Sequence, residues 1–515
     1  MMVRDLSLPD KGPPPAQVEV LVIGGGPAGS LAAAALAREG VEVALLERES
    51  FPRYHIGESL LTSVLPVLEF VGALETIDTW GFIRKPGGLF HLFPDRPPGY
   101  IDFSRHSRFP YSYQVLRSEF DTLLLQHASE CGAHVATSTP ATAIEWEEQR
   151  PIRVHWQGKD GTPGTTRPRF LLDASGLSGM LPSRYLHNRS FHELFRNLAV
   201  GGYWTGVRPD TGPRAGASVV EVLPGGQGWV WFIPLHNGTV SVGVVTPSAG
   251  WHHAAQGSVE HMYRQQVGQV PHIHSRLLGA SLEGKPHTWR DWSYSASTFA
   301  GPGWFLLGDA ACFIDPFFST GVHLASLGAL SAAASVCAIR RGEVDEARGA
   351  LFHDTLLRRA WWRLMLVVGG VYLKMSGRGG ASFPQLDVAT FKDSFDALQP
   401  LLSGNLDLNR QVLPPEEVVR VAQVLAEGLL ALHTCPVGDL SAGGPLTQLM
   451  ATRAAQLDLP EMGPGEQVDG YHLRLERGRL GLEWGGTSRK WAGVLKSAVI
   501  RTGVKLSSWW DLGEG

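Results

Sequence analysis

The feature that most constrains the fold of this chain is a strand, a glycine-rich turn and a helix near its start. Val18–Ile23 is a short β-branched run, which is typical of a buried parallel strand. It leads directly into Gly24–Gly29, with the spacing G-x-G-x-x-G, and then into an alanine-rich helix expected over Ser30–Arg38. A second strand over Val41–Leu46 ends at Glu47, so the segment predicts a βαβ unit that binds a dinucleotide.

Each glycine of this turn has a physical role in such a unit. Gly24 permits the tight turn, Gly26 lets the backbone approach a pyrophosphate, and Gly29 lets the helix pack on the strand. An acid at the end of the second strand binds a ribose. The alternative is a glycine-rich turn that binds no ligand, but this alternative does not explain why Glu47 stands at the end of the second strand, where the ribose-binding acid is expected. The cofactor contacts predicted here are Gly24, Gly25, Gly26, Ala28, Gly29, Glu47 and Arg48.

The composition limits the classes to which the chain can belong. Its 515 residues, 43% hydrophobic and 18% charged, predict a globular protein of two or three closely packed lobes. The formal net charge of −4 gives no reason to expect nucleic acid or an anionic membrane as a partner. The four cysteines lack metal-type spacing, and the apolar run Leu364–Leu373 is too short to span a bilayer. We therefore expect a cytoplasmic protein without a metal site.

Four further segments resemble those of the p-hydroxybenzoate-hydroxylase-like flavoproteins. The loop Phe51–Ser59 is similar to their flavin-contacting loop, and Arg117–Asp121 fits their R-x-x-F-D helix start. Phe170–Gly176 is similar to a later strand and turn of the same lobe, and Trp304–Ala311 to the second flavin signature. Without the resemblance, Arg117 at the start of a helix is also compatible with an ordinary solvent-exposed residue. The resemblance implies FAD as the cofactor, with contacts from Ile56, Glu58, Arg117 and Asp309.

Trp229–Pro234 reads W-x-W-x-I-P, which places two indoles on one face of a strand that the proline ends. Alone, this pair is most simply read as core aromatics. Two other segments give it meaning: Phe82–Gly88 with F-x-x-K-x-G, and Asp315–Val322 with a terminal Ser-Thr-Gly-Val. Together with the dinucleotide unit, they resemble the flavin-dependent halogenases, in the branch that acts on phenols or polyketides. The resemblance runs from about Val18 to about Cys337.

Lys85 matches the lysine that lies between the flavin pocket and the substrate pocket in these halogenases. The resemblance implies that reduced FAD, dioxygen and chloride give hypochlorous acid, which Lys85 holds and directs at an electron-rich carbon. Burial lowers the pKa of a lysine from ~10.4, so an ammonium and an amine are both compatible with this role. The alternative is an ordinary surface lysine.

The resemblance also implies a halide site. A turn ending in Ser-Thr-Gly presents backbone N–H groups suited to a small anion, and an ordinary helix N-cap is a compatible alternative. Chloride or bromide is assigned to Ser319, Thr320 and Gly321, with Val322 against the isoalloxazine ring. Tryptophan halogenases carry a glutamate where this chain has Phe318. That departure disfavours free tryptophan and favours a phenol, a carrier-tethered aromatic or an enolisable polyketide.

Trp229 and Trp231 are implied to act as gatekeepers of the tunnel between flavin and substrate, not as participants in bond making. No second G-x-G-x-x-G follows a strand, so a dedicated NAD(P)H lobe is not expected. The resemblance accordingly implies a separate flavin reductase as partner. The alternatives are a flavin monooxygenase of the same fold, a saturase-type reductase and a flavoprotein that only binds.

The predicted fold class is α/β, with a Rossmann-like FAD-binding domain interleaved with an antiparallel substrate-side sheet and followed by a largely helical C-terminal region. We expect a disordered leader over residues 1–17 and a core over 18–346. The substrate sheet is expected at about 87–113 and 197–296, and a region that caps the substrate pocket at 347–515.

Local patterns give further expectations. The alternation in Thr239–Val245 predicts a half-buried strand, and Trp361, Trp362 and Tyr372 are candidates for lining the substrate pocket, with core packing as the alternative. Beyond residue 347 we expect helices over Arg358–Lys374 and Glu416–Leu432, a loop-rich segment Ser376–Asn405 and a Pro/Gly stretch over Pro436–Gln467.

Overall fold

The computed structural model describes most of the chain as far as Met375 and shorter parts beyond it. The segments Glu416–Leu432 and Pro436–Gln467 lie almost entirely outside the described residues, as does most of Ser376–Asn405. The described residues are 6–8, 11–93, 96–105, 107–192, 195–248, 258–290, 293–375, 396–408, 421 and 467–485.

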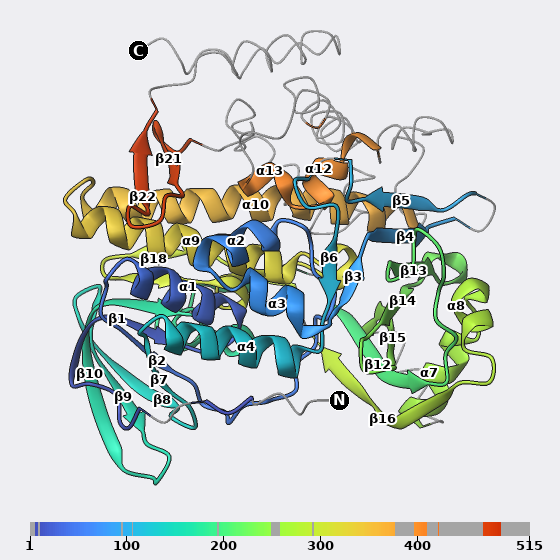
Figure 1. Cartoon of the computed structure of the whole chain (residues 1–515), viewed down its shortest axis with the longest axis horizontal. Coiled ribbons are helices and arrows are strands. Elements are labelled where there is room, and N and C mark those ends of the chain that lie inside the picture. The colour runs from blue at the N-terminus through green and yellow to red at the C-terminus, as the bar shows by residue number, and fades with distance from the viewer. Residues whose placement is uncertain are drawn as a thin grey trace.

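The first layer is an eight-stranded sheet built around the βαβ unit (Figure 1). β1 (Gln17–Ile23) pairs in parallel with β2 (Val43–Leu46) and β10 (Pro163–Asp173). Ile23 lies level with Leu46 and Asp173, so the three strands end at one edge of the sheet. The main path runs β18-β19-β10-β1-β2-β7, and β8 and β9 attach to β10. The other bounds are β7 His134–Ala136, β8 Ala141–Glu147, β9 Arg150–Gln157, β18 Ala300–Gly301 and β19 Trp304–Leu306.

Helices α1 (Pro27–Arg38) and α9 (Gly321–Arg340), which pack against each other beside this sheet, are rich in small buried residues. α1 begins at a proline, whose missing N–H is tolerated in the first turn, and it also packs against α4 (Arg117–Glu130). By length and composition α9 is the one described helix that passes as a membrane span, and its apolar stretch lies buried inside the protein. The smaller helices are α2 Val64–Val71, α3 Leu74–Trp80 and α5 Met180–Arg184.

The second layer is a seven-stranded sheet with the order β16-β12-β15-β14-β13-β4-β5, drawn at the right of Figure 1. The short helices α7 (Val259–Val267) and α8 (Pro271–Arg276) cover one face, where Tyr263 and Ile273 are fully buried. The strands are β4 Gly87–His91, β5 Gly99–Asp102, β12 Asn197–Thr205, β13 Ser218–Val222, β14 Trp229–Pro234, β15 Val240–Pro247 and β16 Ser281–Arg290.

The prediction of a half-buried strand over Thr239–Val245 is wrong in one respect. All of β15 except its last residue is buried, because each face of the strand has a covering layer. Val242 and Val244 pack in the cluster under α7 and α8, while Gly243 on the other face lies beneath an indole ring.

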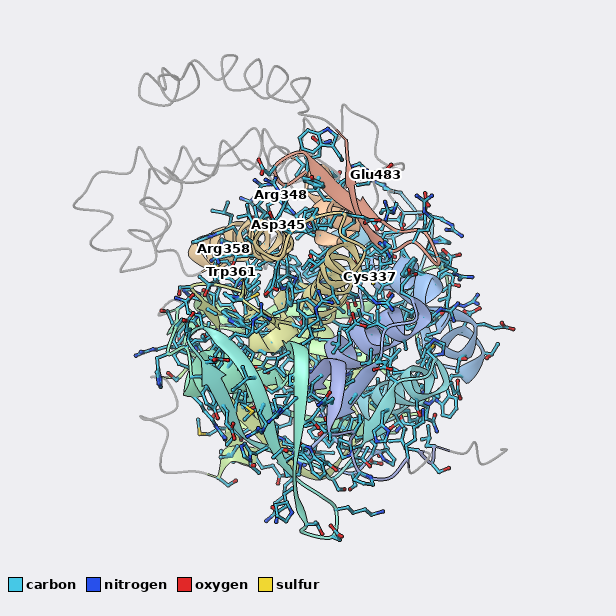
Figure 2. The ribbon with its side chains drawn as sticks, turned by 90° about the vertical axis from the view of Figure 1, so that its left-hand side faces the viewer. Cys337, Asp345, Arg348, Arg358, Trp361 and Glu483 are labelled. Atoms are coloured by element: carbon cyan, nitrogen blue, oxygen red, sulfur yellow. The ribbon has the colours of Figure 1, made fainter. Side chains whose placement is uncertain are left out.

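The described C-terminal parts lie against the helical layer. α10 spans Glu346–Met375, longer than the helix expected over Arg358–Lys374, and Figure 2 shows Arg348, Arg358 and Trp361 along it. Arg348 bonds Asp469 at 2.6 Å, which ties α10 to the hairpin of β21 and β22 that carries Glu483. The remaining bounds are α12 Gln399–Leu402, α13 Asn405–Leu408, β3 Ile83–Lys85, β6 Ser112–Gln114, β11 Arg189–Phe191, β17 Tyr294–Ala296, β20 Cys312–Phe313, β21 Tyr471–Arg474 and β22 Gly481–Trp484.

Candidate active site

A cavity of about 420 Å³ opens where the first sheet meets the second. Its walls include the turns that follow β1, β2, β10 and β19, the edge at which open α/β sheets bind ligands. Four predicted site residues do not line it: Gly25, Gly29, Lys85 and Thr320. The predicted site residues that line it are Gly24, Gly26, Ala28, Glu47, Arg48, Ile56, Glu58, Arg117, Trp229, Trp231, Asp309, Ser319, Gly321 and Val322.

The glycine-rich turn leaves no room for side chains at two positions. Gly24 has a φ of +107°, and a Cβ there would lie 2.2 Å from the carbonyl oxygen of Ala174. A Cβ at Gly29 would lie 1.9 Å from the carbonyl oxygen of Gly24, so this glycine sets how closely the helix approaches the strand. The Gly25 N–H donates to Glu47 Oε2 at 2.6 Å, which fixes the acid at the rim of the cleft.

These residues fit FAD. No side chain among the described residues caps α1, so its first backbone N–H groups are available to phosphate oxygens. Gly26 gives the phosphates a close approach, since it presents no side chain to the cleft. Glu47 stands where a ribose hydroxyl is bound in such units.

Arg117 is a buried residue, not a solvated one. Its guanidinium donates to the Asp121 carboxylate at 2.7 and 3.0 Å and to the carbonyl oxygen of Ile56 at 2.6 Å. Burial acts to raise the pKa of Asp121, but the charge and hydrogen bonds of Arg117, with Arg53, outweigh it and hold that pKa low. Arg117 therefore joins helix α4 to the loop Phe51–Ser59 at the wall of the cleft.

Asp309 is the second carboxylate on the cofactor side of the cleft. It lies in the turn after β19, on the edge predicted for it. Burial raises the pKa of Asp309 to about 6, and the charges of Arg117 and Arg189 oppose that rise. A hydrogen-bond donor from a ligand would favour the ionised form.

Lys85 lies buried at the end of β3, with only 2% of its surface exposed. Its Nζ donates to Ser59 Oγ at 2.7 Å and to the carbonyl oxygen of Leu60 at 3.1 Å, and it lies 5.2 Å from the Phe103 ring centroid. Ser59 lines the cleft, so Lys85 stands one side chain behind the wall. Burial lowers the pKa of Lys85 to about 7, which lets the ammonium and the amine coexist near neutral pH.

The indole of Trp231 lies on two glycines. Trp231, Gly243 and Gly201 are in register across β14, β15 and β12. A Cβ at Gly243 would lie 2.0 Å from the Trp231 ring, and one at Gly201 would lie 2.8 Å from it. The indole Nε1 donates to Ser241 Oγ at 3.1 Å. The neighbouring strands thus hold this side chain in place at the cleft wall.

Trp229 is fixed from behind by a hydrogen-bond chain. Its Nε1 donates to the Tyr372 hydroxyl at 2.6 Å, and that hydroxyl donates to Asp315 Oδ2 at 2.8 Å. The Trp229 ring lies 6.0 Å from Trp231 and 5.0 Å from Phe317, between ring centroids. Both tryptophans therefore belong to one aromatic wall on the side of the second sheet.

The turn before α9 fits a small anion. Ser319 has a φ of +61°, in the left-handed region, and the next residue, Thr320, is 1% exposed. Thr320 Oγ1 has no hydrogen-bond partner in the described part of the chain, and no described side chain caps α9. The side-chain cap considered from the sequence is thus not formed. A buried free hydroxyl beside an uncapped helix start offers a chloride both a donor and a positive dipole end.

A buried polar network holds the start of α9. His323 lies one turn into the helix, with Nδ1 2.9 Å from Ser63 Oγ and Nε2 2.7 Å from Asp407 Oδ2. Asp407, on α13, is also bonded by Arg363 of α10. The network fastens the segment 396–408 to the helix whose N-terminus faces the cleft.

Trp361 and Trp362 do not line the described cleft. They are buried in α10, and Trp361 packs on His192 at 5.2 Å between ring centroids, as the core-packing alternative had it.

Some cleft residues were not predicted individually. Arg53, His55, Ser59 and Ser175 lie in the two segments that resemble flavoprotein motifs, but they were not named as contacts. The others come from segments without a motif: Pro140, Met180, Arg184, Trp289 and Phe313.

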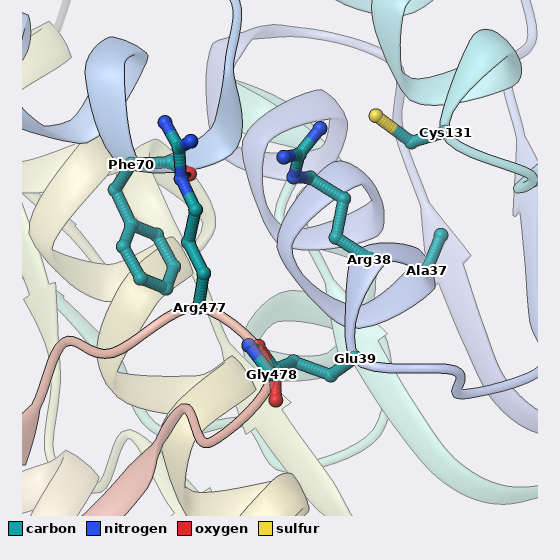
Figure 3. A pocket seen from close by; sticks show the side chains of 7 residues that line it. All are labelled: Ala37, Arg38, Glu39, Phe70, Cys131, Arg477 and Gly478. Carbon is teal, nitrogen blue, oxygen red and sulfur yellow. Dashed lines mark hydrogen bonds between the residues drawn. The ribbon is translucent and has the colours of Figure 1, made fainter.

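A second hollow lies apart from this cleft, between α1, α4 and the turn of the C-terminal hairpin (Figure 3). Arg38, Glu39 and Arg477 border it, and the Cys131 thiol lies at its side. Arg477 donates to the carbonyl oxygens of Glu69 and Phe70, so its guanidinium is already occupied. None of the predicted site residues borders this hollow.

Comparisons with known proteins agree with this geometry. Residues 17–364 match the family described as FAD binding domain. Flavin-dependent halogenase armH1 of Armillaria mellea is 41% identical, with 91% of this chain and 98% of the relative covered. Sulochrin halogenase gedL of Aspergillus terreus is 38% identical, with 92% and 94% covered.

A solved structure agrees as well. The myxobacterial chondrochloren halogenase CndH, an FAD-dependent halogenase, matches with a TM-score of 0.66 and 28% identity, covering 80% of this chain and 98% of that one. The FAD cleft, the identities over most of the chain and this shared fold lead to one conclusion: the chain belongs to the flavin-dependent halogenases, and it is an FAD-dependent oxidoreductase.

Proposed function

We propose that this halogenase uses chloride and a supply of reduced FAD to make hypochlorous acid, which Lys85 holds and delivers to a phenolic or enolisable polyketide-like substrate. The observation that carries the proposal is the buried Lys85, which is separated from the FAD cleft only by Ser59. When bound in its reduced form, FAD supplies the electrons with which dioxygen and chloride give hypochlorous acid. A separate flavin reductase provides that form.

The surroundings of Lys85 support this role. Ser59 and Leu60 accept two of its N–H bonds, and the third hydrogen of the ammonium remains to bind the oxygen of hypochlorous acid. That bond makes the chlorine more electrophilic. Because the pKa of Lys85 is lowered to about 7, a fraction is also the free amine, which is able to take the chlorine itself as a chloramine.

The residue before Ser-Thr-Gly supports the proposed substrate class. Phe318 is buried against Phe90 and Phe317, 5.2 and 4.8 Å away between ring centroids, at the position where tryptophan halogenases carry a glutamate. Because this position supplies no acid or base, it suits a substrate whose own hydroxyl or enol makes the carbon nucleophilic. One relative in the family is a sulochrin halogenase.

The direct test supplies reduced FAD, dioxygen, and chloride or bromide together with a panel of phenols, β-diketones and free tryptophan. Mass spectrometry is expected to show the halogen isotope pattern in phenol or β-diketone products, with tryptophan unchanged. Products heavier by one oxygen, formed equally well without halide, would instead establish a monooxygenase of the same fold.

Replacing Thr320 by valine is expected to weaken the halide site. The change removes the buried free hydroxyl at nearly constant volume, and a hydrogen bond to an ion contributes ~1.5–3 kcal/mol. The KM for chloride should therefore rise roughly 10-fold or more, with kcat at saturating chloride retained. Ser326→Ala is the matched control, since that hydroxyl donates to a backbone carbonyl within the same helix. An unchanged chloride KM in Thr320→Val would contradict this assignment.

Replacing Trp231 by alanine is expected to make the enzyme less selective between halogenation and oxygenation. The cleft would lose part of the aromatic wall, so substrate can approach the flavin and oxygenated product should appear beside a reduced yield of halogenated product. Loss of the buried indole costs ~3–5 kcal/mol of unfolding free energy. Trp204→Ala is the control, because Trp204 is equally buried on the opposite face of the same sheet. Equal product ratios in both variants would remove the gatekeeper role.

A further inference from the structure

Glu58 is a buried carboxyl at the cleft wall that the proposed chemistry has not used. It is 1% exposed and lines the cleft next to Ser59, the residue that holds Lys85. Its Oε1 accepts a hydrogen bond from the Tyr203 hydroxyl at 2.6 Å. Its other oxygen, Oε2, is buried and has no hydrogen-bond partner among the described residues, although the Ser241 hydroxyl is close enough to lower the pKa of the carboxyl. Oε1 is therefore anchored, and Oε2 is the oxygen left for a bound group.

The hydrogen bond of Glu58 leads outward to two tyrosines in contact. Tyr203 lies on β12, where the pairing with β16 shifts register between Gly201 and Tyr203. The Tyr54 ring lies edge-on to the Tyr203 ring, 6.4 Å away between ring centroids, and each phenol affects the pKa of the other. Tyr54 is 45% exposed and stacks on His287 at 4.7 Å between ring centroids. The chain Glu58–Tyr203–Tyr54 thus runs from the cleft to a residue in contact with solvent.

Halogenation consumes one proton in each turnover, and that proton must reach the cleft from solvent. Reduced FAD, dioxygen, chloride, one C–H bond and one proton give oxidised FAD, one C–Cl bond and two waters. The C–H carbon and the reduced flavin each supply two electrons, and dioxygen takes all four. One proton more than the substrates carry is therefore needed in each turnover.

We propose that Glu58, Tyr203 and Tyr54 form the path that delivers this proton from solvent to the cleft. The proposal rests on the halogenation described under Proposed function. The O–H bond of the protonated Glu58 breaks as its proton passes to an oxygen atom derived from dioxygen, which leaves as water. Glu58 is reprotonated by Tyr203, Tyr203 by Tyr54, and Tyr54 by bulk water, so each tyrosine loses one proton as it gains another.

The groups around Glu58 are compatible with this role. Burial raises its pKa, which keeps a protonated fraction at higher pH than for an exposed glutamate, while Tyr203, Ser241 and the charge of Arg117 oppose the rise. Asp315 is buried nearby, but its oxygens are bonded to Tyr372 and to the Phe317 N–H, and it does not line the cleft. Asp309 does line the cleft, with a pKa raised by burial to about 6, but it lies on the cofactor side, in the turn after β19. Glu58 is the cleft acid that is hydrogen-bonded to Tyr203.

The test compares Glu58→Gln, Tyr203→Phe and Tyr54→Phe with Tyr263→Phe. Tyr263 is the matched control because it is a buried tyrosine packed on the same sheet, bonded to Trp204 and to the carbonyl oxygen of Val242, away from the cleft. Removing an acid catalyst costs ~10²–10⁴-fold in rate, so Glu58→Gln should lose at least ~100-fold in kcat. The two tyrosine variants should lose ~10-fold or more and should recover when a small acid such as imidazolium is added.

A second measurement does not depend on turnover. In the protein with oxidised FAD bound, infrared spectroscopy should show a carboxylic-acid C=O band that titrates above the ordinary range of glutamate and is absent in Glu58→Gln. In Tyr203→Phe the pKa should rise further, because the hydrogen bond that favours the carboxylate is lost.

The outcomes separate the two proposals. If the wild-type protein halogenates but the three variants match Tyr263→Phe in rate and in buffer dependence, the proton path is overturned. If no panel substrate is halogenated while the infrared band behaves as described, the proposed substrate is wrong, whereas the protonated Glu58 at the cleft wall is supported. Absence of the band overturns the role of Glu58.

Discussion

Replacing Lys85 by methionine is expected to lower kcat for substrate halogenation by at least ~100-fold, because a positioned acid or base contributes ~10²–10⁴-fold. Binding of FAD should be unchanged, since Lys85 stands behind the wall of the FAD cleft. Consumption of reduced FAD should also continue, with hypochlorous acid escaping to a diffusible β-diketone trap. The measurement is the ratio of halogenated substrate to halogenated trap for each reduced FAD consumed.

The control for this experiment is the neighbouring cation. Arg84→Met removes a charge from the same strand, but Arg84 is exposed and paired with Asp78 at 2.7 Å. It should leave kcat within about two-fold of the wild type, as expected for a surface change. Full halogenation by Lys85→Met would refute the delivery role.

The variant Lys85→Met should be more stable than the wild type at acidic pH. Burial lowers the pKa of Lys85 to about 7, whereas in the unfolded chain it is ~10.4. Below pH ~7 Lys85 is protonated in both the folded and the unfolded state, so burial of its charge destabilises the folded state by the full amount. Between the two values the unfolded state binds more protons, so the free energy of unfolding rises with pH. The gain in Lys85→Met should therefore be largest below pH ~7 and vanish above ~10.4.

Replacing Arg117 by methionine is expected to destabilise the protein by ~3–5 kcal/mol, because it leaves the buried Asp121 carboxylate without its bidentate partner. Affinity for FAD should also fall, since Arg117 lines the cleft and positions the loop at Ile56. Urea unfolding and a fluorescence titration with FAD measure the two effects separately.

Two further variants make this result interpretable. Arg108→Met breaks an exposed bidentate pair with Glu69, at 2.8 and 2.6 Å, and should cost less than ~1 kcal/mol. The double variant Arg117→Met/Asp121→Leu removes both charges and should recover most of the stability but not the FAD affinity. A small loss in Arg117→Met, equal to that in Arg108→Met, would show that burial does not strengthen this pair.

The Arg117–Asp121 pair also makes the free energy of unfolding depend on pH. Because the folded-state pKa of Asp121 is lowered, its stabilising contribution is present above the unfolded value of ~3.9 and is lost as the pH falls through the folded value. Acid unfolding of the wild type should therefore show a contribution from Asp121 that the double variant lacks.

The βαβ unit could be predicted from sequence because its signals are local. The strand, the glycines and the terminal acid must stand in a fixed order along the chain, and the structure places the Gly25 N–H on the Glu47 carboxylate as neighbours of that unit. The helix α10 was predicted too short, since its first turns carry charged residues that dilute the apolar pattern. β15 was misjudged because an alternating pattern does not reveal that a second layer covers its outer face.

Hydrogen bonds between segments that are distant along the chain could not be predicted from the sequence. The partner of Lys85 is 26 positions away, that of Glu58 is 145 away and that of His323 on α13 is 84 away. Ser59 belongs to the flavin-contacting loop recognised from the sequence, but nothing in that motif pairs it with Lys85, and Tyr203 and Asp407 lie in no motif. Any hydroxyl or carboxylate that the fold brings to the right place satisfies such a bond.

By itself, then, the sequence determined the FAD-binding unit and the family, and it predicted roles for Lys85, Trp229 and Trp231, because glycine spacing and tryptophan alternation encode local geometry. Only the tertiary structure decided that Lys85 is buried behind Ser59, that Trp231 rests on Gly243, and that Thr320 keeps a free hydroxyl. Burial and hydrogen bonding depend on which segments the fold brings together, and those contacts set the pKa values and the shape of the cleft.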